Sequence, residues 1–253
     1  MWFNQAKCDI YMGTGAGTKL LKEIGNAQES VKISSPYLSP RMVEELVCLH
    51  KKGIKVSLIT SDTLNSNNYR QQRSIKQLIV QNKNLRPEAD RARKRLKTMA
   101  LILIYAGVLF FFASIILFIT TRNLHFLQVL VFSITFICLS KFFNQKLRTI
   151  RLFEYKYTPL FPFKVFVAPE SSRINEVFIH GKIYIIDGRT AYLGSLNFTE
   201  SGTKYNYETR IRITEEVAVK KIDEEYDKLY YNPEMAFFGV EEWGSYLYPE
   251  PIN

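Results

Sequence analysis

The stretch that decides the fold is His180-Gly181-Lys182-Ile183-Tyr184-Ile185-Ile186-Asp187, followed after six residues by Gly194-Ser195-Leu196-Asn197. The pattern predicts a strand, a turn at Asp187-Gly188 and a second strand that returns alongside the first. Side chains alternate along a strand, so His180 and Lys182 share one face, and the returning strand brings Ser195 and Asn197 close to them. An imidazole, an ammonium group and polar donors therefore converge, as is needed to hold a phosphate and attack phosphorus.

This spacing resembles the HxKx4Dx6GSxN signature of the phospholipase D superfamily, with every specified position filled. The segments at 31–37 and 53–56 look like the family's first strand and strand-entry segments. The resemblance covers roughly residues 9–62 and 160–230. It implies an α/β fold, a phospholipase D-like domain in which a mixed β-sheet is flanked by helices.

The resemblance also implies roles for individual residues. His180 would be the nucleophile and form a covalent phosphohistidine. Lys182 and Asn197 would stabilise charge on the nonbridging oxygens, and Ser195 would add a hydrogen bond there. Glu208, which follows Asn206, matches the acidic residue that orients the family's histidine.

Asp187 completes the predicted catalytic set, but we expect it to anchor the local structure rather than touch substrate. No metal and no cofactor is expected, because Lys182 and its symmetry mate would supply the positive charge. The family needs two such motifs per active site, and this sequence has one, since His50 and His125 lack the pattern. The sequence therefore predicts a C2 homodimer with a shared active site, in which the second histidine acts as general acid.

Two uncharged runs interrupt this domain. The first extends from Met99 to Thr121 and the second from Asn123 to Ser140. A bilayer core of about 30 Å needs about 20 helical residues, and a soluble helix normally keeps a polar face. We therefore predict a two-helix transmembrane hairpin at 99–143, with spans at 99–120 and 124–141, rather than a pair of buried core helices.

The basic residues flank this hairpin. The net charge of the chain is +10, with +8 between Arg70 and Lys97, +4 between Lys141 and Lys156, and −2 elsewhere. The positive-inside rule then predicts an integral membrane protein whose catalytic domain and both termini are cytoplasmic. These blocks should also attract anionic lipid headgroups.

The resulting division has four parts. A discontinuous catalytic domain comprises 1–62 and 160–253, a basic juxtamembrane helical segment comprises 63–98, the hairpin follows at 99–143, and a basic juxtamembrane helix comprises 144–159. A polar helix before the hairpin is expected to break near Pro87, and a strand is expected at 177–179.

Two other features carry little chemistry. The three cysteines Cys8, Cys48 and Cys138 are scattered and odd in number, which is typical of reduced thiols rather than a disulfide framework or a zinc site. The glycine-rich run at 13–19 lacks the third glycine of a dinucleotide fingerprint and the Gly-Lys-Ser/Thr of a Walker A loop, so we interpret it as a turn into a helix.

The substrate stays open among three hypotheses. The hairpin favours phospholipid headgroups, hydrolysed or transferred at the cytosolic leaflet. The alternative is a membrane-tethered, metal-independent nuclease, because Asn197-Phe198-Thr199 resembles the nuclease branch and the basic helices could bind phosphate backbones. A non-enzymatic membrane scaffold is the third, and the complete motif argues against it.

Overall fold

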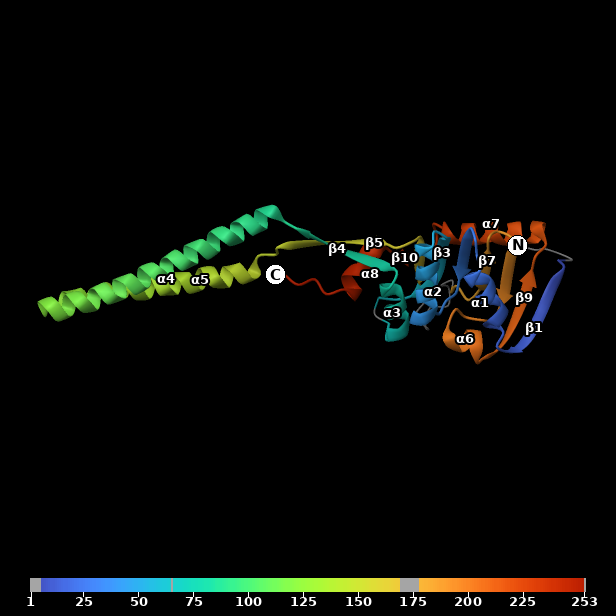
Figure 1. Ribbon diagram of the computed structural model, residues 1–253, viewed down its shortest axis with the longest axis horizontal. Coiled ribbons are helices and arrows are strands. Elements are labelled where there is room, and N and C mark those ends of the chain that lie inside the picture. The colour runs from blue at the N-terminus through green and yellow to red at the C-terminus, as the bar shows by residue number, and fades with distance from the viewer. Residues whose placement is uncertain (1–5, 65, 169–177, 253) are drawn as a thin grey trace. The chain divides into compact units, whose positions relative to one another are not determined.

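The computed structural model describes residues 6–64, 66–168 and 178–252. The chain divides into two compact units. Among the described residues, the first unit comprises 6–81 and 157–249, and the second comprises 82–156 and 250–252. Figure 1 shows the elements of both units along the chain.

The first unit is built on a mixed sheet with the order β1-β9-β8-β7-β2-β3-β6-β10. β2, β3 and β6 are parallel to one another, and the other neighbours pair antiparallel. The strands are β1 Cys8–Thr14, β2 Ser30–Ser34, β3 Lys55–Asp62, β6 Phe163–Val167, β7 Lys182–Ile186, β8 Thr190–Gly194, β9 Tyr207–Ile213 and β10 Phe237–Phe238. The predicted α/β class with a mixed sheet flanked by helices is confirmed.

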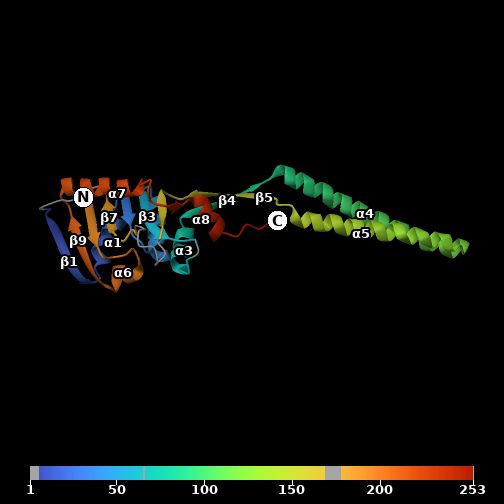
Figure 2. The same cartoon turned by 180° about the vertical axis from the view of Figure 1, so that it is seen from behind.

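Helices cover both faces of this sheet, with α7 on one side and α1 and α2 on the other (Figures 1 and 2). The helices of this unit are α1 Gly17–Gly25, α2 Pro40–Lys51, α3 Tyr69–Lys76, α6 Glu200–Lys204, α7 Glu216–Tyr230 and α8 Val240–Leu247. Val219 and Ile222 of α7 pack with Ile185 and Ala191 of the central strands, so one core lies under α7. Because residues alternate along a strand, Lys182 and Tyr184 lie on the opposite face, toward α1 and α2.

The second unit holds the predicted hairpin. Its helices are α4 Pro87–Thr121 and α5 Val129–Thr149, joined through a 3-10 turn, η1 Leu124–Gln128. Both helices are long and apolar enough to cross a membrane, and only 11% of the most apolar window of each is buried. The first apolar run is helical as predicted. The second span was predicted to begin at residue 124, but residues 124–128 form η1 and α5 begins at Val129; both helices also extend beyond the predicted spans into the basic segments.

The buried positions of the two hairpin helices are small residues. The buried positions of α4 are Ala100, Gly107 and Ser114, seven residues apart. Ser133 of α5 donates a hydrogen bond to the carbonyl oxygen of Gly107 at 2.7 Å, and a Cβ at Gly107 would lie 3.3 Å from the carbonyl oxygen of Ser133. This close approach of two backbones is a common way for membrane helices to associate.

The segments next to the hairpin differ from the prediction. Segment 63–98 was predicted to be helical, but it contains α3, the strand β4 Ile79–Leu85 and the start of α4. Segment 144–159 was predicted to be a helix, but α5 ends at Thr149 and the strand β5 Phe153–Pro159 follows, paired with β4. The alternation in β5, where Glu154 and Lys156 are exposed and Tyr155 and Tyr157 are buried, is typical of a strand and outweighed the basic composition.

Two local predictions are also corrected. Pro87 does not break a helix but begins α4, because proline lacks the N–H that a first-turn residue does not need. The strand predicted at 177–179 is absent at Phe178 and Ile179, which precede β7 without strand pairing, and Val177 lies outside the described residues. The aromatic C-terminal segment contains α8, whose Trp243 is completely buried.

Candidate active site

The site begins at the start of β7, where His180 and Lys182 lie beside each other. The Lys182 ammonium lies 3.2 Å from Nδ1 and 3.1 Å from Nε2 of His180, and it donates a hydrogen bond to the His180 carbonyl oxygen at 2.7 Å. His180 is exposed, whereas Lys182 is only 4% exposed. An accessible imidazole thus lies next to a buried cation.

Burial lowers the pKa of Lys182 from its ordinary value, although the nearby charge of Glu208 opposes this change. The ammonium has lost part of its water and has no carboxylate hydrogen-bonded to it among the described residues. A cation in this condition gains more from an incoming anion than a solvated lysine would. Lys182 is therefore suited to bind a phosphate oxygen.

The return strand β8 brings the second half of the motif to this place. Gly194 pairs with Lys182 across the sheet, and a Cβ at Gly194 would lie 2.0 Å from the Thr209 carbonyl oxygen. Only glycine permits that approach between β8 and β9. This approach places Ser195 against β9. The Ser195 backbone N–H donates to the Thr209 carbonyl oxygen, and the Ser195 hydroxyl donates to Glu208.

Glu208 is buried and accepts hydrogen bonds from the Ser195 hydroxyl and from the Asn206 side chain at 3.2 Å. Sequence reasoning assigned it to orient the histidine. Within the described part of this single chain, the hydrogen-bonding contacts of the His180 ring go to Lys182 instead. The charge of Glu208 acts here on Lys182, and its hydrogen bonds hold Ser195 and Asn206.

Asn197 follows the Gly194-Ser195 turn and is half-buried. Its Oδ1 is shielded from solvent and makes no hydrogen bond to the described residues. The chain around it is fixed, since the Tyr184 hydroxyl donates to the Leu196 carbonyl oxygen at 2.7 Å and the Phe198 N–H donates to Ser35 Oγ at 2.9 Å. An unsatisfied buried amide oxygen is unusual for a purely structural residue.

Asp187 does not lie with this cluster. It follows β7 at the end opposite Lys182, so the length of the strand, about 17 Å, separates them. Its carboxylate accepts hydrogen bonds from the backbone N–H groups of Gln28, Glu29 and Ser30 at 2.7–3.1 Å. Burial works to raise the pKa of Asp187, but these backbone hydrogen bonds and Arg189 outweigh it and hold the pKa below its usual value.

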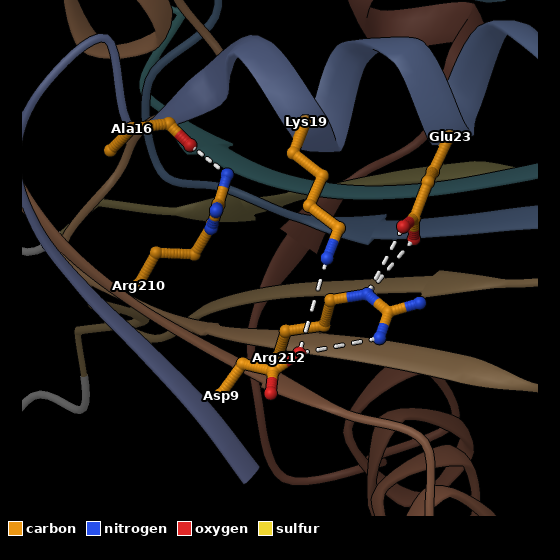
Figure 3. A network of polar contacts seen from close by, with 6 residues as sticks. All are labelled: Asp9, Ala16, Lys19, Glu23, Arg210 and Arg212. Atoms are coloured by element: carbon orange, nitrogen blue, oxygen red, sulfur yellow. Dashed lines mark hydrogen bonds and ion pairs between the residues drawn. The ribbon is translucent and has the colours of Figure 1, made fainter.

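A charged network supports the site from the edge of the sheet (Figure 3). Arg210, two residues after Glu208, donates to the Ala16 carbonyl oxygen at the start of α1, and its guanidinium lies 5.3 Å from the ring centroids of Tyr11 and Tyr192. Arg212 hydrogen-bonds Glu23 of α1 at 3.0 Å. β9 is thereby tied to α1 and β1.

Sequence reasoning did not identify Arg210 or Tyr184 as part of this support. A signal existed, because both occupy the strand face that carries Lys182, and a charged or hydroxyl-bearing side chain on a covered face needs a polar partner.

Within the described residues, no cluster of three or more histidine, cysteine, aspartate or glutamate side chains could hold a metal.

A family model described as "Cardiolipin synthase, PLD-like domain" matches residues 20–98 and 152–230, more than half of the chain. The chain belongs to the phospholipase D superfamily. It is therefore a member of a group of enzymes that act on phosphodiesters. The match omits most of α4 and α5, so the apolar hairpin lies outside the phospholipase D-like domain.

Solved structures resemble the chain at low sequence identity. NucT from Helicobacter pylori gives a TM-score of 0.50 at 16% identity, over 92% of this chain and 100% of that one. Nuc from Salmonella typhimurium, a phospholipase D family member, gives 0.44 at 14% identity, over 92% and 99%. Phosphatidylserine synthase from Haemophilus influenzae gives 0.43 at 12% identity, over 99% of this chain and 44% of that one. A search of curated proteins gives no significant match.

Proposed function

We propose that the protein is a membrane-anchored phosphodiesterase in which His180 forms a covalent phosphohistidine. The observation that carries the proposal is the pair of an exposed imidazole and a buried ammonium group about 3 Å apart. A nucleophile needs access to phosphorus, and the charge that develops on the nonbridging oxygens needs a preorganised cation. Lys182 is that cation, and Asn197 and Ser195 add polar groups next to it.

The reaction has two displacement steps. A ring nitrogen of His180 attacks phosphorus, the P–N bond forms, and the bond to the leaving oxygen breaks as that oxygen takes a proton from an acid. Water then attacks the phosphohistidine, transfers a proton to the same acid acting as base, and restores the imidazole. The acid is His180 of a second copy of the chain, because the other two histidines of this chain, His50 and His125, lack the motif.

Membrane anchoring is supported by α4 and α5. Their large apolar side chains are exposed, including Leu109 at 69% and Ile119 at 62%, while their buried positions are small. The basic residues on either side of the hairpin favour a topology with the catalytic domain and both termini in the cytoplasm. A tethered domain meets membrane-associated substrate at a raised effective concentration.

Two substrate classes have specific support. Phospholipid headgroups are favoured by the apolar hairpin and by the description of the matched family as cardiolipin synthase-like. Nucleic acid is favoured by Asn197-Phe198-Thr199, which resembles the nuclease branch of the superfamily. Both contain the phosphodiester that the cluster is built to attack.

The proposal is tested with the full-length protein in nanodiscs, assayed on bis(4-nitrophenyl) phosphate, anionic liposomes and oligonucleotides without added metal. We expect turnover of the small diester, loss of at least about a thousandfold in His180→Ala, and a phosphoryl adduct on His180 detected by mass spectrometry. Mixing inactive His180→Ala with a second inactive variant, Lys182→Met, should restore no activity, because the shared site of every mixed dimer lacks one of the two imidazoles that serve as nucleophile and acid. Wild-type protein that is inactive on all three substrates, or a fully active His180→Ala variant, contradicts the proposal.

A further inference from the structure

A groove of about 560 Å³ is lined partly by the segment that follows Asn197 in the chain, and it has no part in the mechanism described above. α3 contributes Tyr69, Arg70 and Arg73 to its lining, and the segment around α6 contributes Glu200 and Tyr205. All of these residues belong to the first unit. The groove thus combines cations and aromatic rings on one surface.

The groove is continuous along the chain with the residues expected to hold phosphate. One wall is the segment 199–205, which begins two residues after Asn197 and ends three residues before Glu208. This wall is fixed to the opposite side by a hydrogen bond from the Ser39 N–H to the Phe198 carbonyl oxygen at 3.2 Å, and by one from the Glu200 N–H to Ser39 Oγ at 3.2 Å. A polymeric substrate that leaves the catalytic cluster beside Asn197 would enter the groove.

The charge of the groove is positive. Arg70 and Arg73 are exposed, and neither guanidinium forms an ion pair with any described residue. The one carboxylate in the lining, Glu200, is already paired with Arg41 at 3.3 Å. Two unneutralised guanidinium groups about one helical turn apart suit successive phosphates of a polyanion better than a single headgroup.

The aromatic residues of the groove are unusually exposed. Tyr69 is 81% exposed and Tyr205 is 73% exposed. A tyrosine that leaves its ring in water contributes little to folding, but it offers a flat face on which an unpaired base can stack. Cationic side chains interleaved with exposed aromatic rings are the recurrent composition of surfaces that bind single-stranded nucleic acid.

We infer that this groove binds single-stranded nucleic acid, so that the strand flanking the scissile phosphate lies on Tyr69, Arg70, Arg73 and Tyr205. The inference rests on the proposed phosphodiesterase function and selects nucleic acid as its substrate class. A phospholipid with a single phosphate would leave one of the two guanidinium groups without a matching anion, and its headgroup offers no flat ring to stack on the two tyrosines.

The test measures binding of a fluorescent single-stranded oligonucleotide to full-length protein, with cleavage of the same strand followed separately. Arg70→Ala/Arg73→Ala should weaken binding at least about tenfold and lower the slope of log Kd against log salt by about 1.4, since each phosphate that an arginine neutralises adds about 0.7 to that slope. The matched control Lys55→Ala/Lys220→Ala removes two exposed positive charges elsewhere in the domain and should bind and cleave like wild type. Tyr69→Ala should weaken binding by about fivefold or more, whereas Tyr69→Phe, which keeps the ring, should restore it.

Each alternative outcome has a distinct meaning. If wild type hydrolyses none of the small diester, liposomes and oligonucleotides, the proposed function itself fails. If it hydrolyses at least one of them but the arginine pair and its control bind the oligonucleotide equally, the groove inference is wrong while the proposed function stands. If the arginine pair instead reduces headgroup release from anionic liposomes and leaves oligonucleotide cleavage intact, the groove serves lipid and the inference is overturned. A melting temperature within about 2 °C of wild type excludes misfolding as the cause of weaker binding.

Discussion

The first unit, called the sheet domain below, and the hairpin of α4 and α5 distribute their side chains in opposite ways. In the sheet domain the buried residues are large and apolar, such as Leu58 and Phe166, and the buried charges Lys182 and Glu208 have polar neighbours. In the hairpin, large apolar side chains such as Leu109 are exposed, and the buried positions are small residues. Burial of apolar surface stabilises a fold only against water, so the exposed apolar side chains of the hairpin are what the proposed membrane anchoring requires.

The largest expected effect concerns the buried charge of the sheet domain. Lys182→Met should lower kcat for the small diester by about 100- to 1000-fold, because the developing negative charge loses its nearest cation. Burial lowers the pKa of Lys182, and the ammonium form is the active one, so wild-type activity should fall on raising the pH through a value below the ordinary 10.5. In Lys182→Arg, the guanidinium does not titrate in this range, and any remaining activity should lack this alkaline decline. A pH–rate profile of the three proteins checks this, and an identical decline in wild type and Lys182→Arg would exclude Lys182 as its origin.

The second effect concerns the outward face of the hairpin. Leu109→Arg places a charge near the middle of the apolar run of α4 and should disfavour membrane insertion by about 3 kcal/mol. The same charge at Met99→Arg, at the edge of the run, should be tolerated because the side chain can reach the interface. Carbonate extraction of membranes measures the inserted fraction. Equal extraction of the two variants would contradict a membrane-spanning hairpin and favour burial of α4 against protein.

The sequence predicted the secondary structure of both regions well where one physical requirement explains the pattern of residues. The uncharged runs predicted two long apolar helices, which α4 and α5 form, and the spacing from His180 to Asn197 predicted two adjacent strands, which β7 and β8 form. The connecting strands β4 and β5 were missed, because the basic residues around them were interpreted as flanks of membrane helices. Charge indicates which side of a membrane a segment lies on, but it does not distinguish a helix from a strand.

The arrangement within the site could be predicted only in part. Alternation along one strand brought His180 and Lys182 together, and this follows from local geometry. The partners of Glu208 depend on the register of β8 against β9, which the close approach at Gly194 fixes and which leaves no signal in residue spacing. The groove on α3 was missed for a similar reason, since Arg70 and Arg73 were counted with the membrane-flanking basic residues.

A smaller effect separates anchoring from catalysis within the sheet domain. Asp187→Asn keeps a residue that tolerates the observed φ of 53° but removes the charge that accepts three backbone hydrogen bonds. We expect a loss of about 2 kcal/mol in the free energy of unfolding, with kcat on the small diester retained. Folding lowers the pKa of Asp187. Its contribution to the free energy of unfolding is therefore present at pH values above the ordinary pKa of the carboxyl group, and it is lost as the pH falls through the lowered pKa of the folded state. The free energies of unfolding of wild type and Asp187→Asn should therefore converge as the pH is lowered from neutral. A thousandfold loss of kcat in a stably folded variant would instead mean that Asp187 takes part in the reaction.

The smallest effect concerns the inward face of the hairpin. Ser133→Ala removes the hydrogen bond to the Gly107 carbonyl oxygen but keeps a small side chain, so it should cost only about 0.6 kcal/mol, the average measured between membrane helices. Gly107→Leu should cost considerably more, because its Cβ would already lie 3.2 Å from Ile137 and its remaining carbons would force the helices apart. Resistance of detergent-solubilised protein to SDS denaturation, measured for both variants, gives the order of the two effects. The reverse order would mean that the hydrogen bond, rather than the close packing of the two backbones, holds the hairpin together.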